Sequence, residues 1–265
     1  MENYSPMFEK IDRSIEKKVE LIDNYFMRYA VRAMLACLFL TLGTAIAFAV
    51  AMQGDKMVEG LGRFLFAFMF SWSLIMILYM NAELGTSNML YMTVGVYRNK
   101  VNVSKALKIL FTCILFNMIS GIIVAYFISL TGPYQGLEAG NYLFEGIARK
   151  LDKSTIQIMV EGAFANIVVN TAVLITLRMK DDGGRVPTVI FVIFIFAFLG
   201  FEHVIANFPA FSLAYFASGG TIVGMTTGSV LHNIFFAFIG NYIGGGLIIG
   251  LTYAWLNKVN VKYLD

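Results

Sequence analysis

Long apolar runs separated by short polar segments dominate the chain. An α-helix needs about 20 predominantly apolar residues to cross a bilayer. Six runs meet this requirement, at about 31–52, 64–97, 109–130, 156–177, 186–216 and 229–256. The pattern therefore predicts an all-α polytopic membrane protein with six transmembrane helices.

The second and fifth runs are too long for one ordinary helix, and each contains ionisable residues. Glu83 and Asn88 interrupt the second run, and Glu202 and Asn207 interrupt the fifth, so both interruptions have the form Glu-x-x-x-x-Asn. Tilting absorbs some excess length. The small and polar residues nevertheless favour a non-helical break, which is tolerated only where the backbone lines protein or a cavity.

These interruptions belong to an internal repeat. Asn117 in the third run is followed four residues later by a glycine, and so is Asn241 in the sixth run. Residues 29–130 and 156–257 thus form two three-helix repeats that begin on opposite sides of the membrane. Inverted repeats with broken helices are typical of transport proteins whose site lies near the bilayer midplane.

Residues 1–28 precede the first run and have a helical pattern of their own. The apolar positions that recur at helical spacing are Met7, Ile11, Ile15, Val19 and Ile22. We expect an amphipathic helix at the membrane interface, with a mobile gate as the alternative. The chain then divides into this N-terminal helix and a channel domain at 29–265.

Composition and charge agree with a membrane protein. Of 265 residues, 58% are hydrophobic and 14% are charged, whereas a soluble domain has about 25% charged residues. Fifteen of the 20 Lys and Arg residues lie at the termini and in the loops after the second and fourth runs. Both termini are therefore expected in the cytoplasm of a multi-pass protein of the inner or plasma membrane. Basic residues in such loops set orientation, so we expect the lipid bilayer and no nucleic acid as a partner.

No motif indicates an enzyme, a metal site or a cofactor. The sequence lacks a phosphate-binding Gly-rich loop, a zinc-ligand spacing and paired histidines on one helix face. Cys37 and Cys113 lie inside apolar runs, where packing is their expected role. A membrane-embedded oxidoreductase subunit is the rival from another class, but it would need cofactor ligands, and only His203 lies deep in a run.

Several polar residues are candidates for the transport path. His203 is the strongest, because an ionisable residue beside a break in an apolar run is functional by default; a buried histidine that only bonds a neighbouring helix is the alternative. Glu83 and Glu202 are predicted to cap half-helices or brace the breaks. Thr86 is a pore candidate because a hydroxyl both donates and accepts. Lys150 either attracts anions or is an ordinary loop lysine.

Three segments resemble the formate/nitrite transporter family, most closely its hydrosulfide channel branch. Residues 201–207 read Phe-Glu-His-x-x-Ala-Asn, residues 82–86 read Ala-Glu-Leu-x-Thr, and residues 240–245 read Gly-Asn-x-x-Gly-Gly. The resemblance covers all six runs. It implies a homopentamer of aquaporin-like protomers, each with its own pore for small monovalent anions such as hydrosulfide, formate or nitrite. A neutral-solute aquaporin is a rival, but the repeated Asn-Pro-Ala of aquaporins is missing.

The resemblance also implies roles for single residues. The family's central histidine corresponds to His203, its broken-helix threonine to Thr86 and its outer-vestibule lysine to Lys150. Its apolar pore rings correspond to Phe70, Leu74, Leu84 and Phe196. Residues expected to support the helix breaks are Glu83, Asn88, Glu202, Asn207, Asn166, Asn117 and Asn241.

Gly85 departs from the formate channels, which tend to have Phe at this position. A small residue there is expected to widen the pore, which favours hydrosulfide over formate. An anion loses hydration at an apolar ring, whereas the neutral weak acid crosses more easily. An imidazole titrates near neutrality, so His203 either gives the anion a proton or stays neutral and only hydrogen-bonds it.

Overall fold

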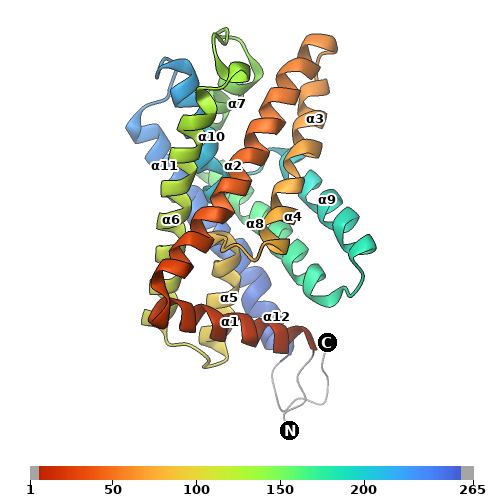
Figure 1. Ribbon diagram of the computed structural model, residues 1–265, viewed down its shortest axis with the longest axis vertical. Helices are drawn as coiled ribbons and strands as arrows, with labels where there is room; N and C mark the ends of the chain where they lie inside the picture. The colour runs from red at the N-terminus through yellow and green to blue at the C-terminus, as the bar shows by residue number, and fades with distance from the viewer. Residues whose placement is uncertain (1–5, 258–265) are drawn as a thin grey trace.

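The computed structural model describes residues 6–257, and every regular element in this part of the chain is helical (Figure 1). Residues 1–5 of the predicted N-terminal helix and 258–265 of the predicted channel domain lie outside the described residues. The α-helices are α1 (Pro6–Asn24), α2 (Phe26–Met57), α3 (Leu61–Phe70), α4 (Trp72–Tyr79), α5 (Gly85–Tyr97), α6 (Val103–Ser129), α7 (Tyr142–Leu151), α8 (Thr155–Arg178), α9 (Asp182–Leu199), α10 (Val204–Ser218), α11 (Thr227–Asn241) and α12 (Thr252–Leu256). The other two elements are the 3₁₀-helix η1 (Gly132–Tyr134) and the π-helix η2 (Tyr242–Leu251).

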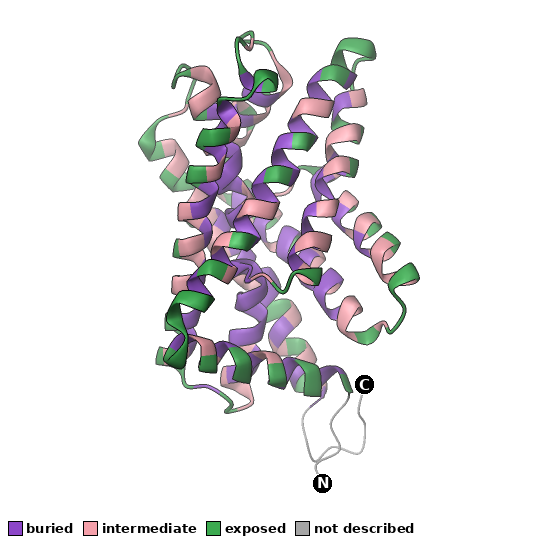
Figure 2. Ribbon diagram, in the orientation of Figure 1, coloured by how far each residue is buried: buried purple, intermediate pink, exposed green. Residues whose placement is uncertain are grey.

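Six helical segments of the described chain are long and apolar enough to cross a membrane, which confirms the predicted number. They are α2, α3 with α4, α6, α8, α9, and α11 through α12. Figure 2 shows buried residues in the interior of the bundle and exposed residues on its outer faces and at its two ends. One boundary differs from prediction, because α9 begins at Asp182, four residues before the start of the fifth apolar run, and includes Pro187.

The N-terminal helix α1 lies across one end of the bundle (Figure 1). Its apolar side chains Met7, Phe8 and Ile15 are buried, and α1 contacts α2, α5 and α8. Asp12 of α1 forms an ion pair with Arg98, with 2.9 Å between Oδ2 and Nη2. The apolar face of α1 therefore packs on protein rather than on lipid. A separate N-terminal unit at 1–28 stays a prediction.

The two halves of the bundle have the same order of elements. The first repeat contains α2, the broken helix α3–α4–α5, and α6. The second contains α8, the broken helix α9–α10, and α11 with η2. Figure 1 shows α2 leading away from the end that carries α1, whereas α8 leads back toward it. The repeats are therefore inverted, as the sequence predicts.

Each broken helix ends its first half at a residue with a positive φ. Asn81 follows α4 with φ 50°, and Gly200 follows α9 with φ 70°. This left-handed conformation ends a helix and is least costly for Gly and Asn. Leu84 and His203 then have extended backbone, and α5 and α10 begin at the next residue. Leu84 and His203 thus hold equivalent positions in the two repeats.

One asparagine satisfies the backbone at the first break. The Oδ1 atom of Asn117 in α6 accepts a hydrogen bond from the Gly85 N–H at 2.9 Å. Its Nδ2 donates to the carbonyls of Glu83 at 3.0 Å and Ala33 at 2.6 Å. A single side chain therefore joins the break to both α6 and α2.

Asn241 makes the equivalent bonds in the second repeat. Its Oδ1 accepts from the Val204 N–H at 2.8 Å. Its Nδ2 donates to the carbonyl of Glu202 at 2.9 Å and to that of Gly162 in α8 at 2.8 Å. Unpaired backbone groups cost several kcal/mol each in a bilayer, so this matched pair of asparagines makes both breaks tolerable.

A close approach of two helices places Asn241 within reach of its break. A Cβ atom on Gly240 would lie 2.3 Å from the carbonyl oxygen of Met159, and one on Gly244 would lie 2.0 Å from that of Ala163. No side chain fits at either position. Small residues four apart thus let α8 pack directly against the backbone of α11 and η2.

We predict that Asn117→Leu and Asn241→Leu each lower the free energy of unfolding by about 3 kcal/mol or more. Each variant leaves one backbone N–H, that of Gly85 or Val204, unpaired and removes two further hydrogen bonds to backbone carbonyls. An unpaired buried polar group costs about 1–3 kcal/mol, and each lost hydrogen bond costs about 0.5–1.5 kcal/mol. Denaturant titration and thermal unfolding in detergent measure the change.

Asn257→Leu is the matched control. The buried side chain of Asn257 donates one local hydrogen bond, to the Tyr253 carbonyl at 3.1 Å. Its loss should therefore cost less than the loss of Asn117 or Asn241. Equal destabilisation by all three substitutions would contradict a special role for the two asparagines at the breaks.

Candidate functional site

The carboxylate of Glu83 lies at the first helix break and is buried. Lys18 of α1 and Arg32 of α2 both form ion pairs with it, the latter with 3.2 Å between Nη2 and Oε1. The Glu83 N–H also donates to the Arg32 carbonyl at 3.0 Å. No described N–H of α5 bonds to the carboxylate. Glu83 therefore connects the break to α1 and α2, an arrangement that fits bracing rather than capping among its two expected roles.

Glu202 is the buried counterpart in the second repeat. Its Oε1 lies 2.7 Å from Lys153 Nζ, and its Oε2 lies 3.0 Å from Lys150 Nζ. Asn207 donates from Nδ2 to the same Oε2 at 2.8 Å. The side chain that caps α10 is that of His203 rather than Glu202. Each glutamate is thus bonded to two cations, and neither side chain caps the half-helix that follows it.

Lys150 bonds inward, to residues of the second break. Its Nζ also donates to Asn207 Oδ1 at 3.2 Å. Burial lowers the pKa of Lys150, although Glu202 opposes this change. Burial also acts to lower the pKa of Lys153, but the carboxylates of Glu202 and Glu161 outweigh it, so that pKa is raised. An anion at Lys150 would therefore compete with Glu202, and a vestibule role for this lysine stays a prediction.

The two asparagines of the Glu-x-x-x-x-Asn segments make different contacts. Asn88 donates from Nδ2 to the hydroxyl of Tyr29 at 3.0 Å, away from Glu83. Asn207 donates to Glu202 and also to Asn233 Oδ1 at 2.7 Å. The sequence repeat is therefore reproduced in the backbone but not in these side-chain bonds.

Two asparagines of α8 lie beside the carbonyl of Thr86. The Nδ2 atoms of Asn166 and Asn170 are 3.3 Å and 3.4 Å from this oxygen. Asn170 also donates to Asn166 Oδ1 at 2.8 Å, and Asn166 donates to the Asn241 carbonyl at 2.8 Å. The first turn of α5 is thus joined to the second repeat, which positions the Thr86 hydroxyl.

His203 and Thr86 meet where the two repeats face each other. The Nε2 atom of His203 lies 2.8 Å from Thr86 Oγ1, and its Nδ1 accepts from the Ala206 N–H at 3.2 Å. A backbone N–H can only donate, so Nδ1 carries no proton in this arrangement. The neutral ring therefore carries its proton on Nε2 and donates it to Thr86.

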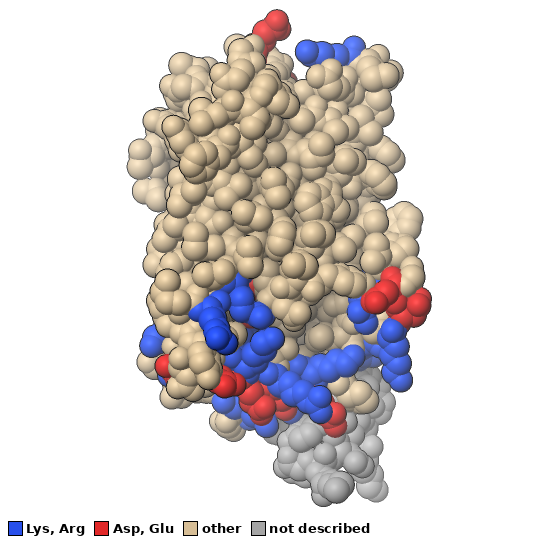
Figure 3. Space-filling view, viewed as in Figure 1, with Lys and Arg blue, Asp and Glu red and all other residues tan. Residues whose placement is uncertain are grey.

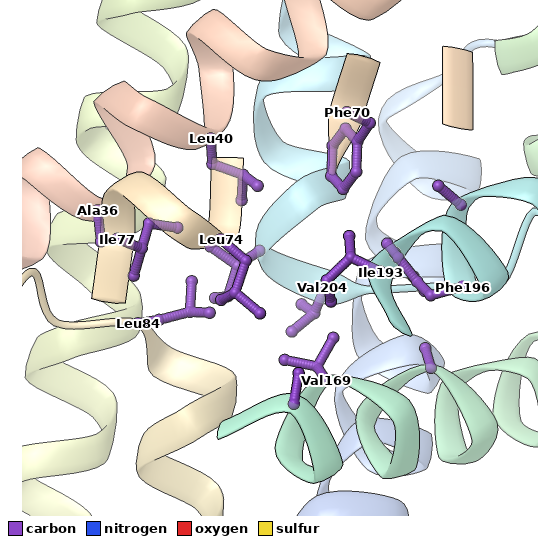
Figure 4. Close-up of a cluster of buried hydrophobic side chains, with 14 of the residues drawn as sticks. Ala36, Leu40, Phe70, Leu74, Ile77, Leu84, Val169, Ile193, Phe196 and Val204 are labelled. Atoms are coloured by element: carbon purple, nitrogen blue, oxygen red, sulfur yellow. The ribbon is translucent and has the colours of Figure 1, made fainter. Parts of the chain in front are cut away.

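An apolar cavity of about 20 Å³ adjoins the imidazole of His203. The other residues that line it are Leu40, Phe70, Leu74, Ile77, Leu84, Val169, Ile193 and Phe196. Figure 4 shows these apolar side chains converging from several helices. The volume has room for about one water molecule. All four residues expected to form apolar rings line this cavity, whereas Thr86 and Lys150 do not.

A larger cavity of about 450 Å³, here called the basic vestibule, lies between α1 and the bundle. Ile77 and Leu84 line both cavities, so the basic vestibule adjoins the apolar one. Figure 3 shows basic side chains gathered over α1 and the neighbouring end of the bundle. The charged residues that line the basic vestibule are Lys10, Lys17, Lys18, Arg32, Arg185 and Glu83.

The side chains of the described residues do not form a metal site. Residues 6–257 contain no group of three or more His, Cys, Asp and Glu side chains that could hold a metal ion. The site offers one hydrogen-bond donor at an apolar constriction and positive charge at one entrance. Such a site suits the passage of a small solute rather than the making or breaking of bonds.

The family model described as "Formate/nitrite transporter" matches residues 5–255. The chain belongs to the formate/nitrite transporter family. It is 32% identical over 250 residues to "Uncharacterized transporter YrhG" of Bacillus subtilis (strain 168), a match that covers 92% of this chain and 91% of that protein. It is 28% identical over 202 residues to "Formate-nitrite transporter" of Plasmodium falciparum (isolate 3D7), over 74% of this chain and 64% of that protein.

Solved structures of the formate/nitrite transporter family share the fold. An "FNT family ion channel" matches with a TM-score of 0.87 at 20% identity, over 94% of this chain and 98% of that one. A "Pentameric formate channel with formate bound" matches with a TM-score of 0.73 at 21% identity, over 87% and 96% of the two chains. These relatives are transporters and channels rather than enzymes.

The sequence patterns did not predict several residues of the site in this transporter. Lys18 and Arg32, which pair with Glu83, were read only as orientation signals, although Arg32 is the last charge before an uncharged run. No sequence signal separates pore-lining apolar residues from lipid-facing ones. The unpredicted cavity residues are Leu40, Ile77, Val169 and Ile193.

The expectation that Gly85 widens the pore of this transporter is wrong. A Cβ atom on Gly85 would lie 2.8 Å from Ile114 Cγ1, 3.1 Å from Ile205 Cδ1 and 3.2 Å from Asn117 Oδ1. The position is therefore packed against α6 and α10, and Gly85 lines neither of the two cavities. The glycine permits close packing at the start of α5 and leaves no extra space for a solute.

We predict that Gly85→Ala lowers the melting temperature, because overpacking a filled site costs about 1–3 kcal/mol. The double variant Gly85→Ala/Ile114→Ala should recover part of the loss, since it removes the nearest atom. Gly132→Ala is the control, because its added Cβ meets nothing within 4 Å. If Gly85→Ala leaves the melting temperature unchanged but alters the anion preference, Gly85 would contribute to the pore after all.

Proposed function

We propose that the protein is a transmembrane channel for small monovalent anions of weak acids, with one pore in each protomer. The observation that carries this proposal is the neutral His203 at an apolar constriction next to a basic vestibule. Positive charge raises the local concentration of anions at the entrance. The apolar cavity then opposes any species that keeps its charge.

The hydrogen bonds of His203 favour the neutral of its two possible roles. An imidazolium needs a proton on Nδ1, but this atom accepts from the Ala206 N–H and caps α10. Protonation would break the cap and add positive charge at a helix N-terminus, where cations are unfavourable. We therefore propose that His203 orients the passing species by hydrogen bonding, and that an anion becomes the neutral acid by taking a proton from water at the entrance.

The size of the cavity supports hydrosulfide as the substrate. About 20 Å³ has room for one water-sized group, which suits hydrosulfide with its single heavy atom. Formate and nitrite have three heavy atoms each and would need side chains to move. Formate or nitrite transport is the alternative, because one solved structure with the same fold is described as a formate channel. A neutral-solute channel is the less favoured alternative.

We also propose a homopentamer in the inner or plasma membrane. The solved formate channel that shares this fold is described as pentameric. Large apolar side chains such as Phe111, Leu115 and Phe127 are exposed on α6, which suits contact with lipid or a neighbouring protomer. The loops rich in Lys and Arg lie at the end of the bundle that carries α1, so this end is proposed to be cytoplasmic.

Labelling with a membrane-impermeant maleimide tests the orientation. Glu138→Cys lies in the exposed loop before α7 and should be labelled only from outside. Lys180→Cys lies between α8 and α9 and should be labelled only from the cytoplasm. The native Cys37 and Cys113 are fully buried and provide a low background. Labelling of both variants from the same side would refute the inverted topology.

Transport by proteoliposomes tests the function. We predict rapid stopped-flow uptake of hydrosulfide, slower uptake of formate and nitrite, and much slower uptake of chloride. Chloride is the anion of a strong acid, so it takes no proton near neutral pH and cannot cross as a neutral molecule. Uptake of chloride as fast as that of the weak-acid anions would overturn the proposal.

His203 variants measured over about pH 5–8 test the mechanism in the same assay. His203→Asn should keep much of the flux and the wild-type pH profile, because Asn is a good N-cap and can donate to Thr86. His203→Leu should lose most of the flux, because it can do neither. A strong loss of flux and of pH dependence in His203→Asn would instead make the imidazole a proton donor.

A further inference from the structure

The basic vestibule has a surplus of positive charge. Among residues 6–257, five cationic side chains line it and Glu83 is the one carboxylate that does so. Glu83 bonds to both Lys18 and Arg32, so one negative charge is shared between two cations. Arg185 is paired with Asp182 at 2.8 Å, but Lys10 and Lys17 form no ion pair with a carboxylate in the part of the chain that the structure describes.

α1 turns a basic side toward this space. Lys10, Ser14 and Lys17 recur at helical spacing and all line the basic vestibule. Two acidic residues of α1 are occupied elsewhere, because Asp12 and Asp23 bond to basic side chains at the end of α5 and the start of α6. The arrangement therefore separates basic from acidic positions on one helix.

Lys17 is an exposed cation in the lining of the basic vestibule. It makes no hydrogen bond or ion pair with any residue that the structure describes. The pKa of Lys17 is lowered by partial desolvation and by the nearby charges of Arg32 and Lys18, although Glu83 acts to raise it. An anion placed among these cations would relieve their mutual repulsion, as any opposite charge does at this range.

The two cavities differ greatly in size. The basic vestibule, at about 450 Å³, lies within the usual range for small-molecule sites of about 300–1,000 Å³. The apolar cavity next to it has about 20 Å³. Polar groups that could orient a ligand also line the larger space, including the side chains of Ser14, Asn81 and Ser87. A molecule of several heavy atoms can thus enter the basic vestibule but not the constriction.

From these observations we propose that the basic vestibule binds a small multivalent anion, a polycarboxylate or a phosphate compound, and that the bound anion blocks the pore. The block rests on the proposed channel function, whereas the binding does not. A monovalent anion becomes neutral with one proton and can pass. An anion with two or more charges stays charged after taking one proton, so the apolar cavity rejects it.

Inhibition of flux from one side tests the block. Formate or hydrosulfide uptake is measured in sealed vesicles whose orientation has been determined, with citrate or pyrophosphate at the α1 side or at the opposite side. Ionic strength is matched with sodium chloride, because salt screens exposed charges. We expect strong inhibition from the α1 side only. Equal inhibition from both sides, or none, would overturn the block.

Lys17→Gln and Lys56→Gln form a matched pair of variants. Each removes one exposed lysine, but Lys56 lies at the end of α2 remote from α1. Lys17→Gln should raise the concentration for half-inhibition about tenfold, because hydrogen bonds to charged groups contribute about 1.5–3 kcal/mol. Inhibition is expressed relative to the uninhibited flux of the same variant. An equal shift in both variants would show general electrostatics and contradict a site.

Direct binding separates this inference from the proposed function. Titration calorimetry of the detergent-solubilised protein with citrate and with pyrophosphate needs no transport. Binding weakened by Lys17→Gln but not by Lys56→Gln supports the site even if no anion is transported. Absence of binding by both compounds overturns the inference and leaves the channel proposal intact. A preference for one compound identifies the carboxylate or the phosphate class.

Discussion

Both helix breaks depend on satisfying backbone hydrogen bonds in a region that water does not reach. Asn117 and Asn241 do so with the same three bonds, one accepted and two donated. This fixes Leu84 and His203, which precede the two half-helices, at equivalent positions, and both line the apolar cavity. The breaks therefore place one apolar and one polar side chain at the constriction from opposite repeats.

The charged residues around the two breaks do not follow this symmetry. Glu83 and Glu202 each join a break to two cations, but their surroundings differ. Near Glu202, Lys153 is shared with a second carboxylate, Glu161, so positive and negative charges balance. Around Glu83 the cations outnumber the carboxylate, and α1 supplies most of them. The repeat thus builds a symmetric backbone path, while the added N-terminal helix makes one entrance basic.

Sequence patterns predicted single residues well where the physical constraint was local. Charged or amide groups inside apolar runs must be bonded, so Glu83, Glu202, Asn117 and Asn241 could be assigned to the breaks before their partners were known. Their partners could not be predicted, because Lys18 lies far away in the sequence. Gly85 shows the same limit, since the residue type did not reveal whether open space or packed side chains surround it.

The sequence by itself determined that the chain spans a membrane six times, that it contains two inverted repeats and that two helices are broken. Apolar length, loop charge and repeated polar residues carry this information, because the bilayer constrains every segment in the same way. Only the tertiary structure decided which apolar side chains line the cavity and which nitrogen of His203 carries a proton. It also decided that α1 packs on the bundle. These properties depend on contacts between residues far apart in the chain, which no local pattern records.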